Sequence, residues 1–151
     1  RLHDQWQLQK FADLVDIISQ RYGLKIILTC GPDQESEVHE ILRKIKNATC
    51  IFIQTGLNEL AAITKRANFV ICHNGGYMHL ASAIGTPIVA LFGSSNPNIW
   101  SPLGNNHVIL QHTVSKSNQK DSLDKRPNYK EHITVEEGLD GVDQVLGNSK
   151  N

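Results

Sequence analysis

Short apolar runs alternate with longer amphipathic segments along most of the chain. The runs are rich in isoleucine, valine and phenylalanine, which is typical of strands that are buried on both faces of a parallel sheet. They predict strands at Lys25–Cys30, Cys50–Gln54, Phe69–His73, Ile88–Gly93 and His107–Gln111.

Between the strands, apolar residues recur at helical spacing. Phe11, Leu14 and Ile18 predict a helix over residues 7–21 with one buried stripe. The same spacing predicts a helix over residues 34–46, with Asp33 as its N-cap. Three more helices are expected: a short one from Leu57, one over residues 77–84, and one from Thr134 that forms a capping box with Glu137 and ends at Gly147.

Strands that alternate with helices form right-handed βαβ units. We therefore predict an α/β fold with a Rossmann-like, doubly wound parallel sheet. Residues 112–131 interrupt the alternation, because they are polar and contain Pro127 and several basic residues, Lys130 among them. We predict a long mobile loop there.

Composition narrows the class of protein. The 15 basic and 15 acidic residues balance, so the charge does not indicate a nucleic-acid-binding protein. No apolar run approaches the roughly 20 residues that span a bilayer. Cys30, Cys50 and Cys72 lie in or beside strand-like runs, and we predict that they are buried free thiols of a cytoplasmic protein.

The loop after the predicted third strand has the composition of a phosphate site. Asn74, Gly75 and Gly76 lead from that strand into a helix, at the edge where open parallel sheets bind ligands. Glycine permits a positive φ and a close approach of the ligand. The N–H groups of the first helical turn favour an anion such as a diphosphate. A plain tight turn is the alternative.

Other familiar sites are not indicated. The chain has neither G-x-G-x-x-G after its first strand nor the P-loop pattern, which argues against NAD dehydrogenases and P-loop NTPases. Cys72 and His73 point to opposite faces of a strand, so they predict no metal site. No spacing indicates a Ser-His-Asp or Cys-His catalytic set. His79, one turn into the helix, is expected to donate to a phosphate, to brace the loop or to be structural.

The longer run around the glycines is more specific. Residues 74–97 read N-G-G-Y-M-H-L-A-S-A-I-G-T-P-I-V-A-L-F-G-S-S-N-P. Together with its flanks, from Phe69 to Pro102, this run resembles the C-terminal domain of glycosyltransferase family 9, the ADP-heptose:lipopolysaccharide heptosyltransferases. The family pattern is roughly D-[ST]-G-x-x-H-L-A-A-A-x-G-x-P-x-x-A-L-F-G-x-[ST]-x-P.

The resemblance implies a GT-B architecture, in which residues 1–151 are the C-terminal donor domain and an N-terminal acceptor domain is absent from this chain. It implies inverting transfer from a nucleotide-diphospho-sugar, such as ADP-heptose, to lipopolysaccharide or a related glycan, without metal or cofactor. The catalytic base is expected in the absent domain, so no catalytic residue is assigned here and this chain alone is expected to be inactive. A cytoplasmic location follows, with peripheral attachment to the inner membrane left open.

The resemblance also assigns donor contacts. It places the ribose at Glu35, the base at Thr55 and Gly56, and the phosphates at Gly76 and His79. Three positions depart from the pattern: Asn74 replaces the motif aspartate, Gly75 replaces a serine or threonine, and Asp4 stands where a lysine often reaches the diphosphate. These departures motivate one alternative, a catalytically inactive nucleotide-sugar-binding or assembly module. Another GT-B-like enzyme, such as a sugar-nucleotide epimerase, is a further alternative.

Overall fold

The computed structural model describes residues 6–112 and 129–148. They divide into two compact units. The small unit comprises Gln7–Leu60, and the large unit comprises the chain from Ala61 onward together with Trp6. Each unit has a parallel sheet of its own.

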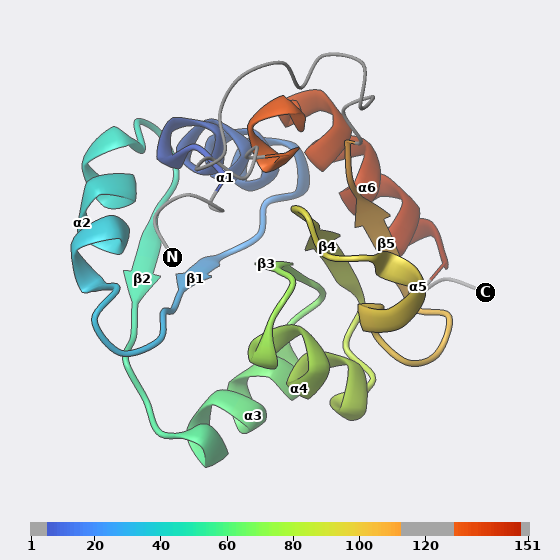
Figure 1. Cartoon of the computed structure of the whole chain (residues 1–151). Helices are drawn as coiled ribbons and strands as arrows, with labels where there is room; N and C mark the ends of the chain where they lie inside the picture. Colours follow the sequence, from blue (N-terminus) through green and yellow to red (C-terminus); the bar gives the residue numbers. More distant parts are fainter. Residues whose placement is uncertain (1–5, 113–128, 149–151) are drawn as a thin grey trace, which may run out of the picture. The chain divides into compact units, whose positions relative to one another are not determined.

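The small unit is built from two helices and two parallel strands (Figure 1). Its elements are α1 (Leu8–Tyr22), β1 (Ile26–Leu28), α2 (Glu35–Lys44) and β2 (Cys50–Phe52). The helices contact each other, and Leu14, Ile18, Val38 and Ile41 are buried. The predicted helices over residues 7–21 and 34–46, each with one apolar stripe, are therefore confirmed.

A buried carboxylate holds the loop between α2 and β2. Asp16 of α1 is 8% exposed and accepts hydrogen bonds from the backbone N–H groups of Lys46, Asn47 and Ala48, at 2.9, 2.8 and 2.8 Å. Burial raises the pKa of Asp16, but these three donors and the charge of Lys46 outweigh it, so the pKa lies below its usual value. The loop thus depends on an ionised side chain from another element.

Two predictions for this unit are wrong. Asp33 does not cap α2: it has a φ of 62°, and the N-cap position is Gln34, whose side chain makes no capping hydrogen bond. β1 and β2 are not buried on both faces, because Ile27 and Ile51 are 47% and 53% exposed. These two residues are paired in register, so their side chains leave the same face of the sheet.

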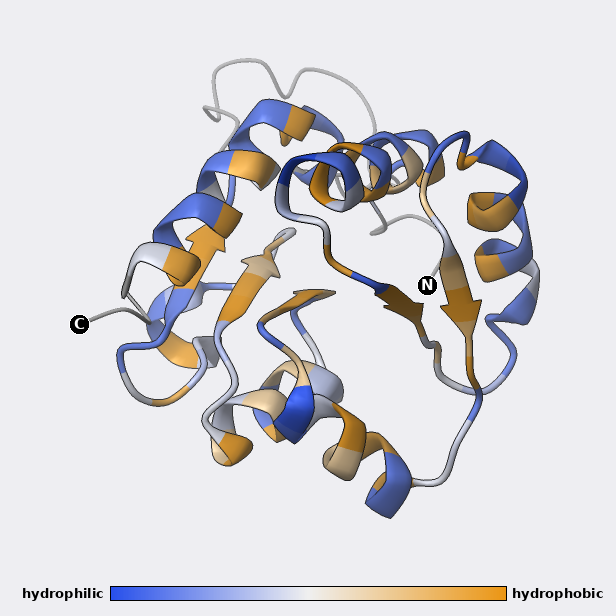
Figure 2. Cartoon of the chain, turned by 180° about the vertical axis from the view of Figure 1, so that it is seen from behind, coloured by the Kyte–Doolittle hydropathy of each residue, from blue (hydrophilic) through white to orange (hydrophobic). Residues whose placement is uncertain are grey.

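The large unit contains a three-stranded parallel sheet in the order β3-β4-β5. Its elements are α3 (Leu57–Arg66, which begins in the small unit), β3 (Val70–His73), α4 (Gly76–Ile84), β4 (Ile88–Leu91), α5 (Pro97–Trp100), β5 (His107–Leu110), the 3-10 helix η3 (Tyr129–His132) and α6 (Val135–Asn148). α4 packs against β3 and β4, whereas α6 packs against β4 and β5. In Figure 2 the strands are largely hydrophobic and the helices alternate in hydropathy.

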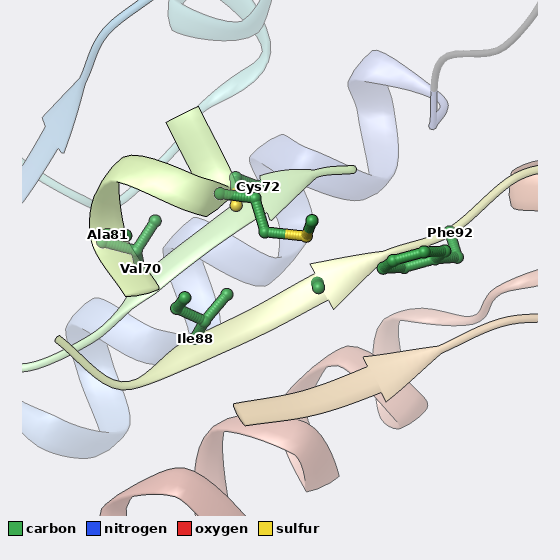
Figure 3. Packing of buried hydrophobic residues seen from close by; sticks show 7 residues of the cluster. Val70, Cys72, Ala81, Ile88 and Phe92 are labelled. Carbon is green, nitrogen blue, oxygen red and sulfur yellow. The ribbon is translucent and has the colours of Figure 1, made fainter. Parts of the chain in front are cut away.

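β4 is buried on both faces. Ile88, Ala90 and Phe92 belong to a core with Val70, Cys72, Met78 and Ala81 of β3 and α4 (Figure 3). Val89 faces α6, where a Cβ added to Gly141 would lie 3.0 Å from a Val89 methyl group. The absence of a side chain at Gly141 therefore allows α6 to approach the sheet closely.

The fold class is confirmed as α/β with parallel strands, although the described strands form two separately hydrogen-bonded sheets. The capping box of α6 is present: Thr134 N–H donates to Glu137 Oε2 at 2.8 Å, and Glu137 N–H donates to Thr134 Oγ1 at 3.1 Å. α6 continues through Gly147 to Asn148, so Gly147 does not end it.

The predicted loop over residues 112–131 is only partly testable, because residues 113–128 lie outside the described ranges. Its last residues belong to η3, where Lys130 is 2% exposed. The assignment of Lys130 to a polar loop is therefore wrong. At this exposure the ammonium group is buried together with its stem, which is costly unless the charge has partners. The short helix α5 was not predicted, because it has a single turn and no apolar stripe.

Candidate functional site

A hollow of about 290 Å³ lies in the large unit, where the loops after β3 and β4 meet. It is lined by Asn74, Gly75, Gly76, Met78, His79, Ser95 and Trp100. A smaller hollow, of about 120 Å³, is lined by residues at the amino ends of β4 and β5, such as Ile88 and His107. Ligands of parallel sheets bind beyond the carboxyl ends of the strands, so the larger hollow is the candidate site.

The two glycines of the loop are not required by the protein's own conformation or packing. Gly75 has a φ of 174°, an extended conformation open to any residue, and neither glycine has a positive φ. Neither glycine therefore uses the positive φ that glycine permits. A Cβ added to Gly75 or Gly76 would meet no atom within 4 Å. What these glycines provide is open space beside the backbone.

That open space lies at the N-terminus of α4. Gly75 occupies the N-cap position and has no side chain with which to cap the first N–H groups. These groups and the helix dipole favour a negative charge. His79, in the second turn, is exposed and also lines the hollow. The site thus combines backbone donors, one imidazole and room for a ligand.

Asn74 carries an unsatisfied acceptor at the same place. Its backbone N–H donates to Leu91 O, and its Nδ2 donates to Ser95 Oγ at 2.9 Å. Its Oδ1 is buried and accepts no hydrogen bond from the described residues. A buried polar atom without a partner is destabilising by about 1–3 kcal/mol. The position therefore suits a ligand or water that donates a hydrogen bond.

Beneath the loop, His73 is held neutral. Burial, and secondarily the charge of Lys130, lowers the pKa of His73 to about 3. Its Nε2 accepts a hydrogen bond from the backbone N–H of Trp6 at 3.2 Å, so the ring proton lies on Nδ1. Trp6 is itself anchored by a 2.8 Å bond from its indole Nε1 to Ile133 O. His73 therefore connects the start of the chain to the end of β3.

This neutral histidine predicts a pH dependence of stability. Its folded pKa lies below the unfolded value of about 6.5, so the unfolded chain binds the proton more readily and stability falls as the pH drops below 6.5. The expected slope from this group is about 1.4 kcal/mol per pH unit. Urea unfolding between pH 7 and 5 measures it. His73→Gln, which keeps an acceptor for Trp6, should lose the slope, whereas His39→Gln on the exposed face of α2 should keep it. Equal slopes in all three proteins would contradict the assignment.

The cysteines are free thiols, as predicted, but only Cys72 is buried. Burial raises the pKa of Cys72 to about 12, and burial also raises the pKa values of Cys30 and Cys50. These thiols are therefore poor nucleophiles at neutral pH. Within residues 6–112 and 129–148, no group of three or more His, Cys, Asp or Glu side chains is arranged to hold a metal.

The remaining predicted donor residues lie in the small unit. Glu35 is the first residue of α2 and is exposed. Thr55 and Gly56 lie between β2 and α3 and are also exposed. Because β1 and β2 are parallel neighbours, both loops leave the same edge of their sheet. Asp4 lies outside the described residues.

Three residues that line the hollow, Met78, Ser95 and Trp100, were not among the predicted site residues, and neither was Gln111, which contacts the loop of Ser95 without lining the hollow. Ser95 belongs to a polar loop after β4, which the sequence does mark as a strand end. Trp100 lies on the unpredicted α5 and is 56% exposed. Gln111 lies just after β5, and its side chain donates to Gly93 O and Ser95 O. No local pattern identifies Trp100 or Gln111, because their roles depend on loops that meet only in the folded unit.

The chain is similar to one known protein family over most of its length. The model of glycosyltransferase family 9 (heptosyltransferase) matches residues 3–130. The chain belongs to glycosyltransferase family 9. It is 30% identical over 148 residues to lipopolysaccharide heptosyltransferase 3 of Escherichia coli K12, covering 93% of this chain and 42% of that protein. It is 24% identical over 149 residues to lipooligosaccharide heptosyltransferase 2 of Haemophilus influenzae, covering 94% and 43%.

Solved structures support the family fold. The E. coli ADP-heptose lps heptosyltransferase II superposes with a TM-score of 0.84 at 19% identity, over 99% of this chain and 44% of that one. E. coli heptosyltransferase WaaC with ADP gives a TM-score of 0.75 at 18% identity, over 96% and 41%. This family 9 chain therefore spans less than half the length of these relatives. No helix in its described parts is long and apolar enough to cross a membrane.

Proposed function

We propose that this family 9 chain is the donor-binding part of a glycosyltransferase. In the complete protein it would bind a nucleotide-diphospho-sugar, ADP-heptose or a close analogue, and the sugar would pass to lipopolysaccharide or a related glycan. The names of its relatives support this substrate class. An acceptor domain outside this chain, a cytoplasmic location and peripheral attachment to the inner membrane are parts of the same proposal.

The observation that carries the proposal is the pair of glycines at the start of α4. A protein gains stability when an unnecessary glycine is replaced, because the unfolded chain then loses less entropy on folding. Gly75 and Gly76 have no internal reason to be glycine, since a Cβ at either would meet nothing within 4 Å. A ligand that packs directly against the backbone would explain why these two positions are glycine. The N-terminus of the helix favours a diphosphate as that ligand.

The proposed reaction is an inverting displacement. The acceptor hydroxyl oxygen forms a bond to the anomeric carbon as the bond from that carbon to the diphosphate oxygen breaks. The bonding electrons leave with the diphosphate, and the acceptor proton passes to a base expected outside this chain. The N–H groups at the start of α4 and His79 would stabilise the negative charge on the leaving group without a metal ion.

The remaining contacts in the proposal follow the family pattern. Glu35 would bind the ribose, and the backbone of Thr55 and Gly56 would line the base. At Asn74 the pattern's carboxylate becomes an amide, which removes a charge but retains an acceptor oxygen. At Gly75 the pattern's serine or threonine is missing, so its hydroxyl is not available to donate a hydrogen bond to the phosphates. The relatives reported above are all named as heptosyltransferases, which supports an active enzyme over the inactive binding module.

Calorimetry on the complete protein tests the donor site directly. Titrations with ADP, UDP and GDP are expected to show binding, with ADP the tightest. If no nucleotide binds at millimolar concentration, the donor-site proposal fails. Release of ADP from ADP-heptose in the presence of a lipopolysaccharide acceptor tests transfer, and this turnover is expected to survive EDTA. Nucleotide binding without turnover would favour the inactive module instead.

A further inference from the structure

Gln111 joins the end of β5 to the loop that follows β4. Its Nε2 donates to Gly93 O at 2.6 Å and to Ser95 O at 2.9 Å. Gly93 is buried, so its carbonyl oxygen depends on a partner inside the protein. Both amide protons of Gln111 are used in these two bonds. The conformation of residues 93–95 is therefore set by a side chain from the neighbouring strand.

The same loop contacts the side-chain amide of Asn74. Ser95 Oγ accepts the hydrogen bond from Asn74 Nδ2 at 2.9 Å. With its NH₂ group engaged in this way, Asn74 is left with Oδ1 as a buried acceptor that has no partner among the described residues. A rotation of the amide would bring its oxygen to Ser95 and leave the NH₂ group unsatisfied instead. The orientation of the Asn74 amide therefore decides whether the site contains a free acceptor or a free donor, and in this structure it is the acceptor.

We propose that Gln111 is a positioning residue of the donor site, which acts through Ser95 to hold Asn74 as a neutral hydrogen-bond acceptor. The inference rests on the proposed donor-binding function. Ser95 accepts from Asn74 and so keeps its own hydroxyl proton to donate. One acceptor and one donor side by side complement a hydroxyl group of the transferred sugar. Loss of this chain of contacts from Gln111 through Ser95 to Asn74, the relay, should therefore weaken binding of the donor's sugar more than binding of its nucleotide.

The chain offers a matched control for Gln111. Asn106 precedes β5 at its amino end and also uses a side-chain amide to donate to a glycine carbonyl, Gly85 O, at 3.3 Å. Asn106 lines the smaller hollow and not the candidate site. Asn106→Leu therefore removes a bond of the same kind from the other end of the same strand.

The test compares four variants in the complete protein: Gln111→Leu, Ser95→Ala, the double variant and Asn106→Leu. Calorimetry measures the Kd for ADP and for ADP-heptose. Gln111→Leu and Ser95→Ala are each expected to weaken ADP-heptose binding about tenfold but ADP binding less than about threefold. The double variant is expected to bind ADP-heptose no more weakly than the weaker-binding of the two single variants, because the effects of residues that act through one another are not additive. Asn106→Leu should leave both Kd values unchanged, and Gln111→Asn should recover part of the loss.

The possible outcomes distinguish a failure of the relay, of its effect on sugar binding and of the proposed donor site. If Gln111→Leu matches Asn106→Leu, or if the losses of Gln111→Leu and Ser95→Ala simply add, the relay is wrong while the donor site stands. If ADP and ADP-heptose weaken equally, the effect is not on the sugar and the inference is overturned. If the unmodified protein binds neither ligand, the proposed function has failed first. Ser95→Ala keeps the test decisive should Gln111→Leu not fold, because it changes one partly exposed hydroxyl.

Discussion

Gly76→Glu is expected to reduce the affinity for ADP by at least about a hundredfold, which corresponds to about 2.7 kcal/mol of binding free energy. The new side chain occupies the space beside the backbone where the diphosphate is proposed to lie, and its carboxylate repels the phosphates. Folding should be unaffected or slightly improved. A Cβ at this position meets nothing within 4 Å, and an acid in the first turn of a helix interacts favourably with the dipole.

This combination separates binding from folding. Thermal unfolding is expected to give an unchanged or higher Tm, while calorimetry shows the loss of ADP binding. Gly147→Glu is the matched control, because Gly147 is an exposed glycine of α6 at which an added Cβ also meets nothing. It introduces the same charge outside the candidate site and should leave the Kd unchanged. Retention of ADP affinity by Gly76→Glu would place the diphosphate elsewhere.

Asp16→Ala is expected to destabilise the protein by about 3 kcal/mol, since hydrogen bonds to a charged group contribute roughly 1.5–3 kcal/mol each and water replaces part of the loss. The three amides that lose their acceptor lie in the loop between α2 and β2. Hydrogen exchange should therefore accelerate first at Lys46, Asn47 and Ala48. Urea unfolding measures the global effect.

The same helix provides the control for this variant. Asp13 accepts a solvent-exposed hydrogen bond from Gln9 Nε2 at 2.8 Å, and Asp13→Ala should change stability by less than about 0.5 kcal/mol. The ionised state of Asp16 adds a pH signature, because its pKa is lowered in the folded state. Its contribution is complete above pH 3.8 or so and is lost as the pH falls further. Similar losses in Asp13→Ala and Asp16→Ala would show that the carboxylate of Asp16 has no special role.

The order of elements could be predicted from sequence because helices and strands follow from local spacing. The stripe of α1, the capping box at Thr134 and the apolar strand β4 each depend on residues within a few positions of one another. The N-cap of α2 was mispredicted for a related reason. Asp33 is a good capping residue, but its φ of 62° places it in a turn before the helix begins. Capping propensity shows which residue types can end a helix, but the course of the backbone decides which residue occupies the N-cap position.

Burial was harder to predict than secondary structure. Ile51 and Val89 both lie in apolar strand patterns, yet Ile51 is 53% exposed and Val89 is fully buried. The difference is that α6 covers Val89, through the close approach at Gly141. Lys130 is the reverse case, a charged residue in a polar stretch that is 2% exposed. Residue type sets only a tendency toward burial or exposure. Whether a given side chain is buried depends on which other elements pack against it in the fold.

The sequence by itself determined the α/β class, the family and the loop of Asn74, Gly75 and Gly76 as the place of interest. It also predicted backbone there that a ligand can approach closely, and a Cβ at Gly75 or Gly76 would meet no atom within 4 Å. Only the tertiary structure decided how the loop is completed. The bonds from Gln111 to the 93–95 loop, and from Asn74 to Ser95, join residues 16 to 21 positions apart. Such contacts depend on which strand ends are brought together, and no local spacing along the chain encodes that.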